Sequence, residues 1–182
     1  MLVDTYRRRL AARAADQYGY VTTHDATALG IPPIELPKLA ATGGLLHVAY
    51  GLWRFDDQPR TGRDQLMEAV LRVGVGAYLT HDAVLAFHEL AAVNPRRIRI
   101  GTPHRARARM PDFVEVLRRQ IDPADLTVYE GVPSATVARA LIDCRDMIMR
   151  DRLLDAVTKA KRTGLLRTRE AQRVLDAIGH DG

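Results

Sequence analysis

The chain has 182 residues, enough for one large domain or two small ones, and 47% of them are hydrophobic. Charged residues interrupt every apolar run before it reaches the roughly 18 residues of a membrane span. The apolar stretch after residues 7–9 is too short for a signal-peptide core, so we expect a cytoplasmic protein with no membrane partner. The net charge of +5 favours an anionic partner. The single cysteine, Cys144, excludes an internal disulfide, and we expect it to be a buried hydrophobic side chain.

Short helices and strands alternate over residues 2–55. The expected order is a helix over 2–18, a strand over 20–22, helices over 23–29 and 33–42, and strands over 45–48 and 52–55. Gly30 supplies the turn between the two short helices, and Tyr50 and Gly51 form the tip of the hairpin. A helix, a glycine-containing turn, a second helix and a tight hairpin are typical of a winged helix-turn-helix.

The helix over 33–42 is the one that would enter the major groove of DNA, and Lys38 is its only cation. Pro37 lacks a backbone donor and clashes with a preceding helical turn, so we expect the regular helix to begin near Pro37 or to kink there. Trp53 and Phe55 alternate in a strand, and we expect them in the core rather than in an aromatic platform for bases.

Six residues are candidates for contact with DNA. Those on the second short helix are expected to face the groove, and the others to hold phosphates beside the first short helix and at the hairpin. Each direct base contact is worth ~1–3 kcal/mol of discrimination, and a helix with one cation makes few of them. The set is Thr22, Thr23, Lys38, Thr42, Tyr50 and Arg54.

Residues 56–62 are polar, contain Pro59 and Gly62, and are typical of an interdomain linker. We therefore expect a DNA-binding domain over residues 1–58 and a second domain over 63–182. In the second domain, helices are expected over 63–73, 81–92 (with Thr80 as N-cap), 136–149, 151–162 and 168–178, and strands over 97–101, 113–117 and 126–129. These elements follow no regular βαβ order, so the expected fold class is α+β with a small sheet.

Arginine is concentrated between residues 96 and 119, where eight arginines stand against two acidic residues. In an extended strand, Arg105, Arg107 and Arg109 would lie on one side about 7 Å apart, which suits contact with successive phosphates. The basic residues singled out for contact with DNA or with a partner are Arg97, Arg99, Arg105, Arg107 and Arg109. The interpretations left open are a solvated loop, a phosphate-binding segment, and a surface for an acidic protein or for RNA.

Patterns for catalysis or metal binding are missing from the sequence. His81 and His88 lie seven residues apart without the His-Glu-x-x-His spacing of a zinc site, and we expect them to be packing residues. Asp143 lies in an otherwise apolar helix, where we expect it to pair with Arg139 or with an arginine of the basic segment. The sequence has no Walker A and no Gly-x-Ser-x-Gly motif. We therefore expect no enzyme activity, no catalytic residue, no metal and no cofactor.

Four stretches carry a family resemblance. The pattern GYVTTHDATALGIPPIELPKLAATGGLLHVAYGLWRF, residues 19–55, resembles the N-terminal domain of AbiEi-type antitoxins from type IV toxin–antitoxin pairs. The stretches YLTHDAVLAFHELAAVNP, RIRIGTPHRARARMPDF and GVPSATVARALIDCRD resemble the second domain of that family. The chain departs from the family where relatives carry several arginines on the second short helix, and at Tyr50, where they often have arginine.

The resemblance implies an antitoxin that represses its own operon by binding operator DNA, with copies associating on paired repeats. Its second domain would neutralise a cognate nucleotidyltransferase-like toxin, directly or functionally. The main alternative is a stand-alone winged-helix transcriptional regulator whose second domain serves dimerisation. A nuclease related to a longer architecture is disfavoured, because the sequence stops at Gly182.

Overall fold

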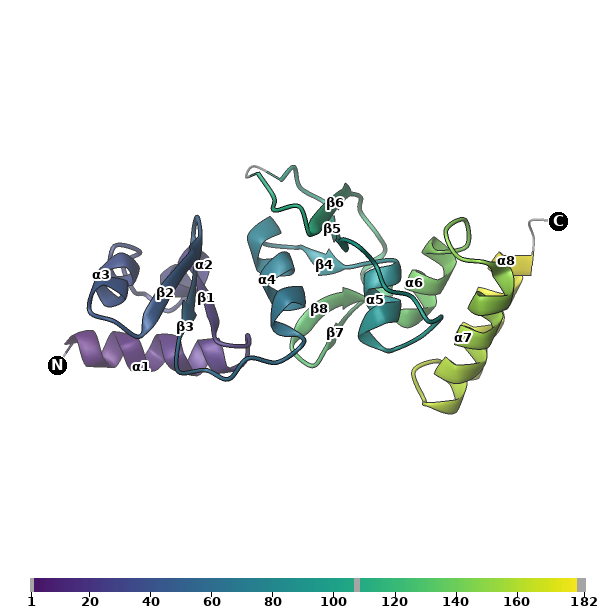
Figure 1. The fold of residues 1–182 in the computed structure, drawn as a ribbon, viewed down its shortest axis with the longest axis horizontal. Helices are drawn as coiled ribbons and strands as arrows, with labels where there is room; N and C mark the ends of the chain where they lie inside the picture. The colour runs from purple at the N-terminus through teal and green to yellow at the C-terminus, as the bar shows by residue number, and fades with distance from the viewer. Residues whose placement is uncertain (1, 107–108, 180–182) are drawn as a thin grey trace. The chain divides into compact units, whose positions relative to one another are not determined.

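The computed structural model describes residues 2–106 and 109–179 and has an α+β fold. Its described residues form eight α-helices, one 3₁₀ turn, a three-stranded sheet and a five-stranded sheet (Figure 1). The chain divides into two compact units, residues 1–74 and 75–182, which we call the head and the body. No helix in the described ranges is both long and apolar enough to cross a membrane.

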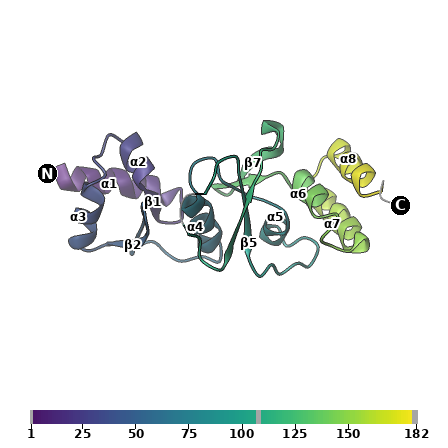
Figure 2. The same ribbon diagram turned by 90° about the horizontal axis from the view of Figure 1, so that it is seen from above.

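The head contains four helices and an antiparallel sheet with strand order β1-β3-β2. Its elements are α1 (Leu2–Ala15), β1 (Tyr20–Thr22), α2 (Thr23–Ala28), α3 (Glu35–Ala41), β2 (Leu45–Ala49), β3 (Leu52–Phe55) and α4 (Asp64–Val73). Helix α1 packs against α2 and against strands β1 and β3, and α3 packs against β2 (Figure 2). The core between them includes Leu10, Ile31, Leu36, Trp53 and Phe55, so the expected core positions of Trp53 and Phe55 are confirmed.

Local sequence signals explain how the two short helices begin. Thr22 caps α2 by accepting a hydrogen bond from the Asp25 amide, and the Asp25 side chain accepts one from the Thr22 amide. Gly30 has φ +66° in the turn that follows α2. Helix α3 begins at Glu35, which makes Pro37 its third residue. Because the first four amides of a helix have no acceptor within it, proline at this position removes no helical hydrogen bond.

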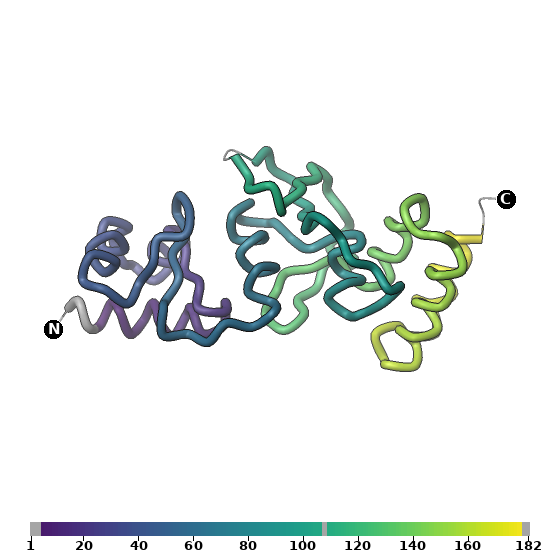
Figure 3. Tube along the Cα trace, in the orientation of Figure 1, coloured from purple at the N-terminus to yellow at the C-terminus, as the bar shows by residue number. Residues whose placement is uncertain are grey.

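Helix α4 belongs to the head, and this moves the boundary between the units from the expected 58–63 to Gly74. The Cα trace runs from the β2–β3 hairpin through residues 56–63 into α4 (Figure 3). Three polar contacts then join α4 to the sheet. The Tyr20 hydroxyl donates to Glu68 (2.9 Å), Arg72 donates to the Val48 carbonyl (3.3 Å), and Arg54 forms an ion pair with Asp64 (3.6 Å).

The body is built on a mixed sheet with strand order β6-β5-β4-β8-β7. The pairs β4–β8 and β5–β6 are parallel, whereas β4–β5 and β7–β8 are antiparallel. Its elements are β4 (Tyr78–Leu79), α5 (Asp82–Phe87), β5 (Ile98–Thr102), β6 (Val114–Arg118), the 3₁₀ turn η1 (Pro123–Asp125), β7 (Leu126–Tyr129), β8 (Val132–Ala135), α6 (Val137–Asp143), α7 (Arg150–Arg162) and α8 (Thr168–Gly179).

Two helices of the body are shorter than expected. Helix α5 ends at Phe87 rather than at residue 92, because Glu89, Ala91 and Ala92 have positive φ angles that no α-helix accommodates. Its N-cap position is occupied by His81, with φ +53°, so the expected cap at Thr80 is wrong. Helix α6 ends at residue 143 rather than at 149. Strands β4 and β8 were not expected from the sequence.

Candidate nucleic-acid interface

Helix α3 presents one buried and one exposed face. Leu36 and Leu39 lie in the core, whereas the opposite side is open to solvent. We call this open side, together with the residue before the helix, the α3 face; it comprises Ile34, Pro37, Lys38, Ala41 and Thr42. Tyr50, in the turn between β2 and β3, is 97% exposed. These two features leave α3 and the hairpin tip accessible to a macromolecular partner.

The α3 face carries little net charge. Lys38 Nζ donates to the Glu35 carboxylate at 2.7 Å, and Thr42 Oγ1 donates to the Leu39 carbonyl at 2.9 Å. The Lys38 side chain is 62% exposed, and an exposed ion pair of this kind contributes only ~0–1 kcal/mol. Lys38 can therefore exchange Glu35 for a phosphate at small cost. The Glu35 partner was visible in the sequence as an i, i+3 pair.

The hydroxyls of Thr22 and Thr23 are already bound within the head. Thr22 Oγ1 donates to the Asp25 carboxylate at 2.6 Å, and Thr23 Oγ1 points to the Gly51 carbonyl at 3.4 Å. The Thr23 amide donates to the same carbonyl at 3.0 Å. These threonines therefore fix the start of α2 and attach it to the hairpin turn.

Arg54 does not lie where a phosphate could reach it, and the expectation of a phosphate contact is corrected here. Its side chain is 3% exposed. The guanidinium donates to the carbonyls of Phe55 (3.1 Å), Gln58 (3.0 Å) and Pro59 (3.2 Å) and lies 5.6 Å from the centre of the Tyr20 ring. Arg54 is consequently a structural residue that holds the chain after β3.

Three arginines of α1 also bind groups of the head. Arg7 donates to the Gly43 carbonyl (3.1 Å), Arg9 to the Leu29 carbonyl, and Arg13 to the Asp25 carboxylate (2.8 Å). Burial alone would raise the pKa of Asp25, but its hydrogen bonds outweigh burial and lower that pKa below its ordinary value. These contacts attach α1 to the ends of α2 and α3.

The arginines of the body fall into two groups. Arg97, Arg105 and Arg109 are exposed. Arg99 is bound by the carboxylates of Asp82 and Glu115, the latter at 3.3 Å. Although burial would lower the pKa of Arg99, these carboxylates raise it. Arg107 lies outside the described residues. The extended row of three arginines expected from the sequence is therefore described only at its two ends.

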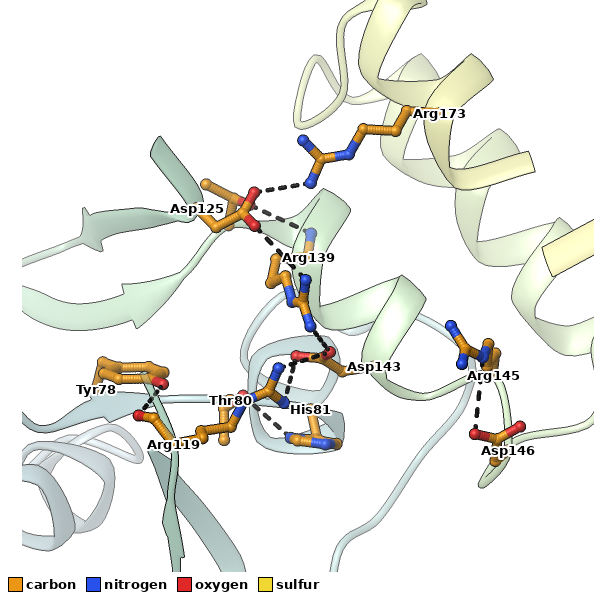
Figure 4. A network of polar contacts seen from close by, with 11 residues as sticks. Tyr78, Thr80, His81, Arg119, Asp125, Arg139, Asp143, Arg145, Asp146 and Arg173 are labelled. Atoms are coloured by element: carbon orange, nitrogen blue, oxygen red, sulfur yellow. Dashed lines mark hydrogen bonds and ion pairs between the residues drawn. The ribbon is translucent and has the colours of Figure 1, made fainter. Parts of the chain in front are cut away.

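A second polar network joins four elements of the body (Figure 4). The Asp143 carboxylate is 5% exposed and receives Arg119 (3.0 Å) from the end of β6 and Arg139 (2.7 Å) from its own helix. Arg139 lies 3.8 Å from Asp125, which also receives Arg173 of α8 at 2.7 Å. The expected pairing of Asp143 is confirmed for both kinds of partner. The contact between Asp125 and Arg173 spans 48 residues and had no sequence signal.

The histidines of the body lie in packed surroundings. His81 Nδ1 contacts Thr80 Oγ1 at 3.0 Å, and burial lowers the pKa of His81 despite the nearby Asp143 (Figure 4). The His88 ring meets the Tyr129 ring edge-on, with 4.3 Å between centroids. Within residues 2–106 and 109–179, no three His, Cys, Asp or Glu side chains are placed to hold a metal ion. Cys144 is fully buried, as expected, and burial raises its thiol pKa to about 12.

Comparison with protein families finds no match to this chain, and comparison with curated proteins finds none either. Among solved structures, the chain is similar to the crystal structure of the RV2827C protein from Mycobacterium tuberculosis, with a TM-score of 0.46 and 20% sequence identity. The match covers 94% of this chain and 71% of that one.

Proposed function

We propose that the head is a winged helix-turn-helix that binds operator DNA through the α3 face and the tip of its hairpin. The observation that carries the proposal is the order α2, turn, α3, β2, β3 on a small antiparallel sheet, with the outer side of α3 left open. Helix-turn-helix proteins place the second helix of this order in the major groove. The hairpin then lies where its tip can contact the sugar-phosphate backbone.

In this proposal, three of the residues selected from the sequence contact DNA. Lys38 leaves Glu35 for a phosphate or a guanine, Thr42 faces the groove, and Tyr50 contacts the backbone from the hairpin tip. Thr22 and Thr23 position α2, and Arg54 supports the hairpin from inside. A single cation on α3 limits direct base readout, so binding of two copies to paired repeats supplies the affinity that one head lacks.

For the body, we propose the antitoxin activity that the family resemblance implies. The support is the resemblance of residues 78–95, 97–113 and 131–146, together with the exposed side chains of Arg97, Arg105 and Arg109. These cations would face an acidic surface of a nucleotidyltransferase-like toxin or the RNA on which it acts. Arginine suits either partner, because its planar guanidinium binds carboxylate and phosphate in a bidentate way.

Binding to DNA from the protein's own promoter, measured by fluorescence anisotropy over a salt series, tests the role of the head. Lys38→Ala and Tyr50→Ala should each weaken binding about 5- to 100-fold, the range for losing a contact worth ~1–3 kcal/mol. Arg60→Ala is the matched control, since it removes one exposed positive charge from the loop before α4. If Lys38→Ala and Tyr50→Ala bind as the control does, the α3 face is not the DNA-binding surface.

Co-expression with the product of the adjacent gene tests the role of the body. Growth should be restored by the full chain and lost again when Arg97, Arg105 and Arg109 are replaced together by alanine. Growth that the triple variant restores fully would show that this arginine surface is not used. An adjacent gene without a nucleotidyltransferase signature would instead favour a transcriptional regulator with no toxin partner.

A further inference from the structure

The body contains a pocket of about 290 Å³ that neither proposed activity uses. Its walls come from Asp82 at the start of α5, from residues 92–95, from residues 147–149, and from Arg152 in the first turn of α7. This volume is at the lower end of the range for small-molecule sites, about 300–1,000 Å³. The pocket therefore suits a ligand smaller than a nucleotide.

One wall of the pocket has an acidic group with a missing partner. Asp82 is 8% exposed and its Oδ2 receives the guanidinium of Arg99, but its Oδ1 is buried without a hydrogen-bond partner among the described residues. Arg99 is shared with Glu115, so two carboxylates here face one cation. A buried carboxylate oxygen without a donor is costly, and a cationic donor in the pocket would remove that cost.

The opposite wall prefers an anion. Met149 occupies the N-cap position of α7 and provides no side-chain cap. The first amide that bonds back to this end is that of Leu153, to the Met149 carbonyl at 3.2 Å, so the amides of residues 150–152 have no acceptor within the helix. The positive end of the helix dipole and the exposed Arg152 guanidinium add to this preference. The rest of the wall is apolar, with Val93, Pro95 and Ile148.

We propose that this pocket binds a free α-amino acid with an apolar side chain. Its ammonium group donates to Asp82 Oδ1, its carboxylate accepts from the first amides of α7 and from Arg152, and its side chain lies against the apolar wall. A ligand with only one of the two charges satisfies only one wall. The body would thus sense an amino acid as an effector, which goes beyond the antitoxin and repressor roles and does not depend on them.

Isothermal titration calorimetry of the full chain with L-leucine and with L-methionine tests this proposal. At least one of them should bind at concentrations below about 10 mM. L-leucinamide lacks the carboxylate and N-acetyl-L-leucine lacks the ammonium group, so each should bind about 10- to 100-fold more weakly than L-leucine, the effect of losing a charge-assisted hydrogen bond. No heat of binding with either amino acid, or equal binding of the two blocked compounds, would overturn the proposal.

Two variants assign the contacts. Asp82→Asn should weaken binding of the free amino acid and leave binding of N-acetyl-L-leucine unchanged. Arg152→Ala should weaken L-leucine but not L-leucinamide, whereas Arg162→Ala, an exposed change at the far end of α7, should alter neither. If Asp82→Asn does not fold, Arg152→Ala with the two leucine compounds decides the question alone, since Arg152 is exposed. Unchanged binding to Arg152→Ala would overturn the proposal.

Discussion

Replacing Arg54 with methionine tests how the head holds helix α4. The substitution keeps an unbranched apolar stem and removes the guanidinium, which serves three backbone carbonyls and the Asp64 carboxylate. Asp64 would keep its hydrogen bonds from the amide and the hydroxyl of Thr61, but its Oδ2 would face a buried site with no cation. Removing one partner of a buried ion pair usually destabilises a protein by about 3–5 kcal/mol.

A loss of that size is a large part of the ~5–15 kcal/mol that separates a folded domain from its unfolded chain. Trp53 is the only tryptophan of the chain and lies in the core of the head, so its fluorescence reports on this unit. With urea slopes of ~1–3 kcal/mol/M, we expect the unfolding midpoint of Arg54→Met to fall by at least about 1 M. Arg60→Met, at an exposed position, should stay within about 0.5 kcal/mol of the wild type.

Two results would refute the reasoning. One is an unfolding midpoint for Arg54→Met that matches the exposed control. The other is a folded Arg54→Met that has lost affinity for DNA, because this would assign Arg54 to the phosphate backbone after all. The double variant Arg54→Met/Asp64→Asn removes the unpaired charge and should recover part of the lost stability, since the two residues act as a pair.

Three further substitutions have expected outcomes. Asp143→Asn leaves two partly exposed arginines without their carboxylate and should destabilise the body by about 2–3 kcal/mol in thermal unfolding of the full chain. Gly101→Ala places a Cβ 2.3 Å from the Tyr78 ring and should lower stability by about 1–3 kcal/mol in the same assay. The folded-state pKa of Asp25 is below its ordinary value of 3.8, so its contribution to stability is complete above that value and is lost as pH falls through the folded pKa. Asp25→Asn should therefore be less stable at neutral pH and show a weaker loss on acidification, followed by Trp53 fluorescence.

Much of the head could be predicted from the sequence, because its signals are local. The capping residues Thr22 and Asp25 are three positions apart, and alternation along β3 placed Trp53 and Phe55 in the core. The turn at Gly30 needs only the conformational freedom of glycine. Each of these features depends on neighbours within a few residues.

The burial of Arg54 could not be predicted in this way. Alternation puts Arg54 on the opposite face of β3 from Trp53, which in an isolated hairpin is the face toward water. Helix α4 arrives ten residues later, contacts that side through Asp64 and Glu68, and encloses Arg54 and its strand neighbour Tyr20. The residue type was therefore compatible with a phosphate contact, and only a tertiary contact decided against it.

The short helix α5 is a second case in which tertiary structure overrides a local pattern. Residues 81–92 have helical composition, but Leu90 is 1% exposed and is buried by a turn that needs positive φ on both sides of it. Lys159 of α7 donates to the Glu89 carbonyl at 2.6 Å, a hydrogen bond that a continuing helix would not leave free. This turn forms part of the amino-acid pocket, which consequently had no sequence signal.

The distribution of charge bears on how the head and the body would share an anionic partner. Residues 1–74 contain nine basic and eight acidic side chains, so four of the five net positive charges belong to residues 75–182. Most basic side chains of the head also bind its own carbonyls and carboxylates. Because each neutralised phosphate contributes about −0.9 to the log–log salt slope, a head of this kind contributes little to salt dependence. In the proposed complex, discrimination then comes from the α3 face, and the electrostatic attraction comes chiefly from the arginines of the body.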